Sequence, residues 1–140
     1  MGRGRPPDVG RRFKWFRRRC DEVAVGDTYD DVEYVPLLER EFLQVARIAV
    51  EDEGSAPTEI RLFITGHGYD HPVAEETSPA AATLYWVRWP TYLVAGEKLV
   101  ARFYGASLND KLVMYLEGWI RDYPVPPPEG ALGVGDALGE

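Results

Sequence analysis

Hydrophobic and polar positions alternate with a period of two in several short segments of the chain. In EIRLFITG (59–66), Ile60, Leu62 and Ile64 share one side, and ATLYWVRWP (82–90) and EKLVARFYG (97–105) alternate in the same way. Further β-like runs are EVAVG (22–26), DVEYV (31–35) and REFLQVARIAVE (40–51). Several short strands separated by turn-rich segments predict an antiparallel β-sandwich or barrel.

The segment NDKLVMYLEGWIRD (109–122) fits two periods, and the fold class depends on which one applies. A helix would gather Leu112, Val113, Leu116, Trp119 and Ile120 on one face, whereas a strand would alternate Leu112, Met114 and Leu116 with polar and aromatic neighbours. Gly118 would weaken a helix interior by about 1 kcal/mol. The preceding GASLND (105–110) is typical of a hairpin connector between two strands. We therefore predict a strand, and with it an all-β chain.

REFLQVARIAVE also allows two interpretations. As a strand it places Phe42, Ala46, Ile48 and Val50 on one side, and as a helix it gathers Leu38, Phe42, Val45 and Ala49. A short helical turn is compatible with PLLERE (36–41), and HGYDHPVAEETSPA (67–80) is expected to be a long loop. The overall prediction is a single antiparallel β-sandwich or jelly-roll-like barrel with extended N- and C-terminal arms.

The proposed domain limits follow composition. Residues 1–20 are rich in Gly, Pro and Arg and form the predicted basic arm, residues 21–123 form the β-sandwich domain, and residues 124–140 form a Pro- and Gly-rich tail. Four prolines in positions 124–128 favour an extended, polyproline-like course for the tail.

Composition limits the classes of protein. The 140 residues, 45% of them hydrophobic, suffice for one core, and no apolar run is long enough for a membrane span. The basic N-terminus lacks the apolar stretch of a signal peptide. The single cysteine, Cys20, cannot form an intramolecular disulfide and fits a reducing cytoplasm. Thirteen Arg against three Lys, with few amide side chains, indicate either a thermophilic source or a GC-rich genome.

The charge is divided along the chain. Residues 1–20 carry eight Lys and Arg against one Asp, a net charge of +7, and residues 21–140 carry a net charge of −14. A basic end and an acidic body point to a second copy of the same chain as a partner.

RRFKWFRRR (11–19) interleaves cationic and aromatic side chains. Such a segment can bind nucleic acid, lie across a neighbouring protein subunit, or remain a solvated basic tail. The acidic body argues against nucleic acid, so we predict a protein-interaction arm. Its contact residues are Arg11, Arg12, Phe13, Trp15, Phe16, Arg17, Arg18 and Arg19.

Two other groups of side chains could support chemistry. Imidazole and carboxylate groups at His67, Asp70 and His71 make these residues weak candidates for a metal site, and we favour a polar surface loop or a subunit contact over it. Aromatic residues that could bind a sugar or line an interface gather in LYWVRWPTY (84–92): Tyr85, Trp86, Trp89 and Tyr92. No nucleophile or phosphate-loop motif is present, so we predict no catalytic residue, no metal and no cofactor.

Several strand and turn signals lie within residues 32–120. They are Val35-Pro36 before a strand, the step formed by Leu93, Gly96, Glu97 and Leu99, the turn formed by Gly105, Ala106 and Asp110, and a final strand ending at Gly118. With these signals, residues 32–120 resemble small β-sandwich proteins of tailed-phage virions. Neither the basic arm nor the proline tail belongs to the match.

This resemblance implies a jelly-roll-like capsid decoration or head-fibre protein that is not an enzyme. The expected partners are further copies of the chain, as a homotrimer, and a major capsid protein. The expected location is the virion surface after assembly in the host cytoplasm, with no membrane contact. The alternatives are a glycan-binding module of a tail or fibre and a small metal-dependent enzyme.

Overall fold

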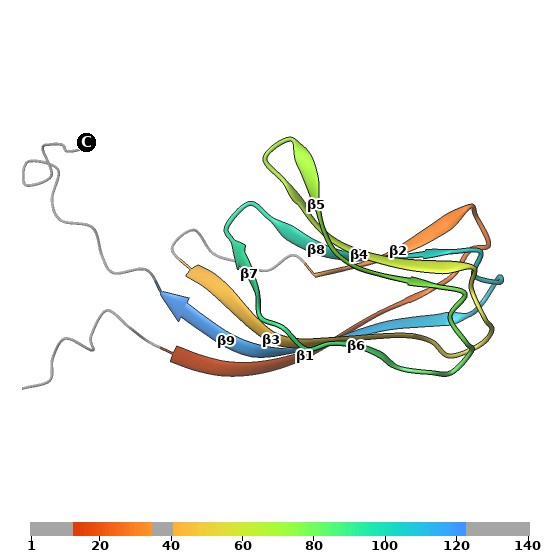
Figure 1. Cartoon of the computed structure of the whole chain (residues 1–140), viewed down its shortest axis with the longest axis horizontal. Helices are drawn as coiled ribbons and strands as arrows, with labels where there is room; N and C mark the ends of the chain where they lie inside the picture. The colour runs from red at the N-terminus through yellow and green to blue at the C-terminus, as the bar shows by residue number, and fades with distance from the viewer. Residues whose placement is uncertain (1–12, 35–40, 123–140) are drawn as a thin grey trace, which may run out of the picture.

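The computed structural model describes residues 13–34 and 41–122, and this part of the chain is entirely β (Figure 1). It forms two antiparallel sheets that pack face to face, which confirms the predicted β-sandwich. The nine strands are β1 (Phe13–Val23), β2 (Tyr29–Tyr34), β3 (Glu41–Asp52), β4 (Glu59–Gly66), β5 (Tyr69–Thr77), β6 (Tyr85–Val87), β7 (Thr91–Val94), β8 (Lys98–Tyr104) and β9 (Lys111–Asp122).

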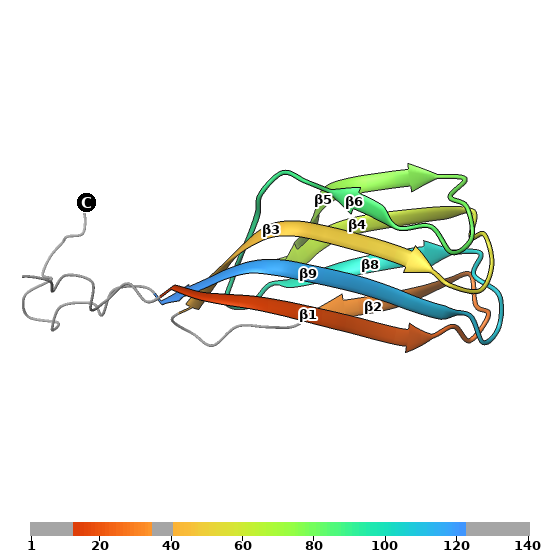
Figure 2. The ribbon, with the colours of Figure 1, turned by 90° about the horizontal axis from the view of Figure 1, so that it is seen from below.

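The two sheets mix strands that are far apart in the sequence. The first sheet has the order β1-β9-β3-β6, with β7 also paired to β3, and Figure 2 shows it face on. The second sheet has the order β2-β8-β4-β5. The core between them is built from the inward residues of both, of which the largest fully buried are Phe103, Leu43, Ile48, Leu93, Leu99, Leu112 and Met114.

The strand prediction for residues 109–122 is confirmed. Leu112, Met114 and Leu116 point into the core, and β9 pairs with β1 on one side and β3 on the other. The predicted hairpin between β8 and β9 is wrong, because β8 lies in the second sheet and β9 in the first. Alternation shows that a segment is a strand, but it does not show which strand is its neighbour.

The strand interpretation of residues 40–51 is also confirmed, but of the four residues predicted to share one side only Ile48 and Val50 do so. A bulge between Val45 and Arg47 inserts one extra residue, so Leu43 and Val45 point inward before it and Ile48 and Val50 after it. Gly118 lies opposite the bulge, and a Cβ atom there would be 2.1 Å from the carbonyl oxygen of Gln44.

Two segments predicted to lack regular structure are strands. Residues 13–20, assigned to the arm, form most of β1, so the boundary between arm and domain lies at Phe13 or before it. β1 is an edge strand and has one hydrogen-bonded neighbour, β9. Because Phe16 is the one large side chain among those described that β1 buries, its sequence shows no strong alternation of hydrophobic and polar residues. The predicted loop 67–80 contains β5. The rest of the predicted arm, most of the possible turn at 36–41 and the tail lie outside the described residues.

Candidate functional site

The outer face of the first sheet carries exposed aromatic side chains in register across neighbouring strands. Trp15 of β1 lies opposite Trp119 of β9, which lies opposite Gln44 of β3, which lies opposite Tyr92 of β7. The Trp15 and Trp119 rings meet edge to face with their centroids 4.7 Å apart. Outward side chains of neighbouring strands are close enough to act as one surface.

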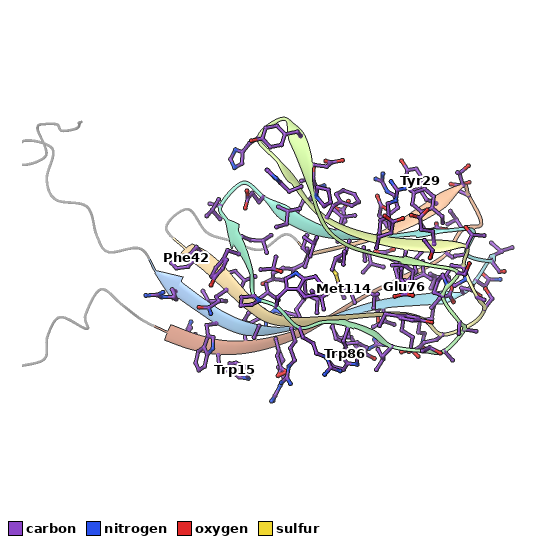
Figure 3. The ribbon with its side chains drawn as sticks, viewed as in Figure 1. Trp15, Tyr29, Phe42, Glu76, Trp86 and Met114 are labelled. Carbon is purple, nitrogen blue, oxygen red and sulfur yellow. The ribbon has the colours of Figure 1, made fainter. Side chains whose placement is uncertain are left out.

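We call this surface the aromatic face and define it by Trp15, Trp86, Tyr92, Tyr115 and Trp119. The exposed fraction is 41% for Trp15, 44% for Trp86, 54% for Tyr92 and 38% for Trp119. Figure 3 shows Trp15 and Trp86 pointing away from the second sheet, with Met114 between the sheets and Tyr29 on the opposite outer surface.

A row of charges runs beside the tryptophan row. Glu117 of β9 accepts two hydrogen bonds from Nη2 of Arg47, at 2.6 and 2.7 Å, and lies 3.7 Å from Nε of Arg17. The hydrogen bond from Arg47 lowers the pKa of Glu117, so this carboxylate stays ionised. Both arginines are more than half exposed, so the row adds little to stability but fixes a positive rim beside the aromatic rings.

The next row forms a groove. Arg19, Tyr115, Ala49 and Trp86 lie in register, and Ala49 is fully buried although it faces outward, because the two larger rings flank it. The groove has a volume of about 260 Å³. Its lining residues are Arg17, Arg18, Arg47, Leu84, Trp86, Tyr115, Leu116 and Glu117.

The structure divides both groups of predicted contact residues. Of the predicted arm, Trp15 belongs to the aromatic face, Arg17 and Arg19 face outward beside it, and Phe16 is in the core. The guanidinium of Arg18 lies 5.5 Å from the Phe16 ring centre. Arg11 and Arg12 lie outside the described residues, and for Phe13 only the backbone, within β1, is described.

The aromatic cluster of residues 84–92 also separates. Trp86 and Tyr92 join the aromatic face, but Tyr85 packs against the core, and its hydroxyl accepts a hydrogen bond from the Ala80 N–H at 2.7 Å. Trp89 lies at the open edge between β5 and β6. There it lines a cavity of about 160 Å³ together with Glu76, which points between the sheets (Figure 3).

The weak metal candidates lie at the β4–β5 turn. The ring of His71 meets Tyr69 edge to face at 4.7 Å, and Nε2 of His67 lies 4.0 Å from the Glu97 carboxylate. Within the described part of the chain, no three His, Cys, Asp or Glu side chains are grouped so as to hold a metal ion. The structure therefore does not gather His67, Asp70 and His71 into a site.

A second polar cluster joins two loops at the other end of the sandwich. Oδ1 of Asp52 accepts hydrogen bonds from the N–H groups of Gly54 and Ser55, at 2.9 and 3.1 Å. Asp110 accepts hydrogen bonds from the Ser55 hydroxyl and the Ser107 N–H. Burial raises the pKa of Asp52 to about 6, and Asp110 raises it too. Burial acts against ionisation of Asp110 as well, but its hydrogen bonds lower its pKa overall.

Sequence reasoning missed half of the site. Arg47, Tyr115, Glu117 and Trp119 were used only as parts of strands. The alternation in β9 contained a usable signal, because the side opposite Leu112 and Met114 holds Tyr115 and Trp119. The pairing that places Trp15 beside Trp119 had no signal in the sequence.

No protein-family model matches the chain, and no curated protein matches it. Among residues 13–34 and 41–122, no helix has the length and apolar character needed to cross a membrane.

Proposed function

We propose that this protein is a non-catalytic structural protein that associates with further copies of itself and decorates or cements the capsid of a tailed phage. One observation carries the proposal, which is that Trp15, Trp86, Tyr92 and Trp119 stand partly exposed on one side of one sheet. Scattered exposed apolar residues are common, but a contiguous group with a charged rim is typical of an interaction surface.

The energetics favour a protein partner. Tryptophan, tyrosine and arginine are the residues that most often dominate binding energy at protein interfaces. Burying what remains exposed of each ring would stabilise a complex by about 1 kcal/mol per residue, before the more favourable ring and cation contacts are added. The aromatic face holds four such rings beside Arg17 and Arg47.

The phage setting rests on the resemblance of residues 32–120 to small virion β-sandwich proteins. Its turn positions have a structural reason, since Gly96 and Gly105 adopt φ angles of 91° and 75°, which favour glycine. The Glu97 carboxylate accepts a hydrogen bond from the Val94 N–H at 2.9 Å and closes the turn between β7 and β8. These turns explain how neighbouring strands of the sandwich are connected. The virion role is proposed from the resemblance, not from the turns themselves.

Light scattering on the full-length protein tests self-association. We expect an oligomer, a trimer by the resemblance, which Trp119→Ala shifts towards monomer at the same protein concentration. Trp89→Ala is the matched control, because Trp89 is also an exposed tryptophan, at 58% against 38% for Trp119, but lies off the aromatic face. A monomeric wild-type protein, or equal masses for both variants, would contradict the proposal.

Sedimentation of the same proteins with purified phage capsids tests the capsid role, and Trp119→Ala should cosediment less.

Glycan binding is the second candidate, because Trp86 and Tyr92 offer exposed rings on the same face and Arg17, Arg47 and Glu117 offer hydrogen-bonding groups beside the groove. It predicts that the wild-type protein binds members of a glycan panel and that Trp86→Ala removes the binding. A wild-type protein that binds no member of a broad panel would contradict it.

A further inference from the structure

We propose that the Pro-rich C-terminal segment of one copy, residues 124–140, binds the aromatic face of a second copy. This inference rests on the proposed self-association and names the segment that occupies the face. It follows from the chemistry of the face, from the charge of the segment and from the place where β9 ends.

The aromatic face has the chemistry that recognises proline-rich segments. Such segments dock into grooves lined by aromatic rings, and their extended conformation loses little entropy on binding. The groove beside Trp86 and Tyr115 lies on the same outer face as the Trp15–Trp119 pair, with the charged row of Arg17, Glu117 and Arg47 between them. The sequence PVPPPE (124–129) supplies the matching prolines.

Charge complementarity supports the same segment. Residues 124–140 contain three acidic residues, Glu129, Asp136 and Glu140, and no Lys or Arg. At the groove Arg47 holds Glu117 closely, whereas Arg17 is 3.7 Å from that carboxylate and 74% exposed. Arg17 can therefore pair with an incoming carboxylate without breaking a short hydrogen bond.

The outer surface of the first sheet is more basic than that of the second sheet. Outward positions of the first sheet include five basic residues, Arg17, Arg19, Arg47, Lys111 and Arg121, and three acidic ones, Asp21, Glu51 and Glu117. Outward positions of the second sheet include three basic residues, Arg61, Lys98 and Arg102, and five acidic ones, Asp31, Glu33, Glu59, Asp70 and Glu75. An acidic segment is attracted to the first surface and repelled by the second.

The basic N-terminal residues fit this face poorly. Residues 1–12 carry four Arg and one Asp, so they would bring positive charge towards Arg17 and Arg47. Two aromatic faces packed directly on each other would likewise oppose arginine to arginine. The acidic, proline-rich segment avoids both repulsions.

The position of the β9 terminus favours a second copy over the same chain. β9 ends at Asp122, and only Tyr123 separates it from Pro124. To bring the prolines onto Trp119 of their own chain, the backbone would have to reverse within this one residue. A residue before a proline favours an extended backbone, and proline-rich sequence is stiff, so this reversal is unfavourable. Binding to the face of a neighbouring copy requires no such reversal.

A complementation experiment with full-length proteins tests the inference. The tail variant carries Pro126→Ser, Pro127→Ser and Pro128→Ser, and the face variant carries Trp119→Ala, with Tyr92→Ala as a second face variant if the first loses its fold by circular dichroism. We expect each variant alone to be monomeric by analytical ultracentrifugation. An equal mixture should form a heterodimer, because the intact tail of one variant can bind the intact face of the other.

The outcomes separate this inference from the proposed function. A tail variant that assembles like the wild type, while the face variant is monomeric, overturns the tail inference and leaves self-association standing. If both variants are monomeric and their mixture forms no heterodimer, the tail of one copy does not bind the aromatic face of another, and the inference is overturned. A face variant that assembles like the wild type, or a monomeric wild type, overturns both proposals.

Discussion

Both sheets alternate inward and outward side chains, but their outer faces differ in how far charged side chains cover the aromatic rings. On the second sheet, Arg102 donates two hydrogen bonds to Asp31, at 2.8 and 2.9 Å, and its guanidinium lies 3.9 Å from the Tyr29 ring centre and 5.0 Å from that of Phe63. Tyr29 keeps an exposed fraction of 42% beside this guanidinium, but Phe63 is buried although it faces outward. On the first sheet the tryptophans stay partly exposed. A charged side chain that covers rings makes a solvated surface, and rings left uncovered make a surface able to bind.

Both sheets contain a bulge, and the bulge of the first sheet shapes its outer face. If alternation ran unbroken from Gln44 through Ala46, Arg47 would point towards the core. With the bulge, Arg47 lies opposite Glu117 and completes the charged row. The second sheet has its register shift between Leu62 and Phe63, beside Pro72 of β5.

The substitution expected to lower the free energy of unfolding most is Gly118→Ala, opposite the bulge of the first sheet. The new Cβ atom would lie 2.1 Å from the Gln44 carbonyl oxygen and 2.9 Å from the Ala46 nitrogen, both backbone atoms, so the bulge must move. We expect a loss of about 3 kcal/mol or more in the free energy of unfolding, measured with urea. Gly68→Ala, on the second sheet's turn, meets no atom within 4 Å and should lose only about 1 kcal/mol for its positive φ. Similar losses for both variants would show that the close approach at Gly118 is unimportant.

The next largest expected difference is between two variants that each lack one arginine of one outer face. The hydrogen bond to Asp31 raises the pKa of Arg102, and Arg102→Ala would leave that carboxylate unpaired and uncover Phe63. We expect it to lower the free energy of unfolding by about 2 kcal/mol. Arg47→Ala removes an exposed pair, so about 0.5 kcal/mol or less is expected. Equal urea midpoints for the two variants would mean that the faces do not differ in this respect.

A third expected effect, smaller than those of Gly118→Ala and Arg102→Ala, lies off both faces, at Asp52. Its pKa is about 6 in the folded protein and about 3.9 in an unfolded chain, so folding favours the protonated form. Stability is then lost as the pH rises from about 4 to about 6. Asp52→Asn keeps an acceptor for the Gly54 and Ser55 N–H groups and cannot ionise. It should be about 1 kcal/mol more stable than wild type at pH 7.5, with no gain at pH 4.

The matched control for this prediction is Asp110→Asn. Hydrogen bonds from Ser55 and Ser107 favour the charged form of Asp110, so its substitution should destabilise the protein at pH 7.5. Urea unfolding at the two pH values measures both variants. A gain from Asp110→Asn equal to that from Asp52→Asn would show that the two carboxylates are interchangeable. Neither substitution should change the assembly state, because both residues lie away from the aromatic face.

The sequence by itself determined the β class and most inward-facing positions. Ile60, Leu62 and Ile64 of β4, and Leu99, Ala101 and Phe103 of β8, point inward as their alternation predicted. Side chains of a strand alternate between two sides whatever the strand pairs with, so a period of two is a local property. The bulge in β3 escaped prediction because it depends on the close approach of Gly118 on the neighbouring strand.

Only the tertiary structure decided which outward residues share a surface. Trp15 and Trp119 come from opposite ends of the chain, and Trp86 and Tyr92 come from two short strands on the far edge of the same sheet. Sheet hydrogen bonds are made by the backbone groups that nearly every residue has, so local sequence does not specify the neighbouring strand. Burial of the inward residues of all strands together selects the pairing, and that pairing brings the aromatic rings onto one face.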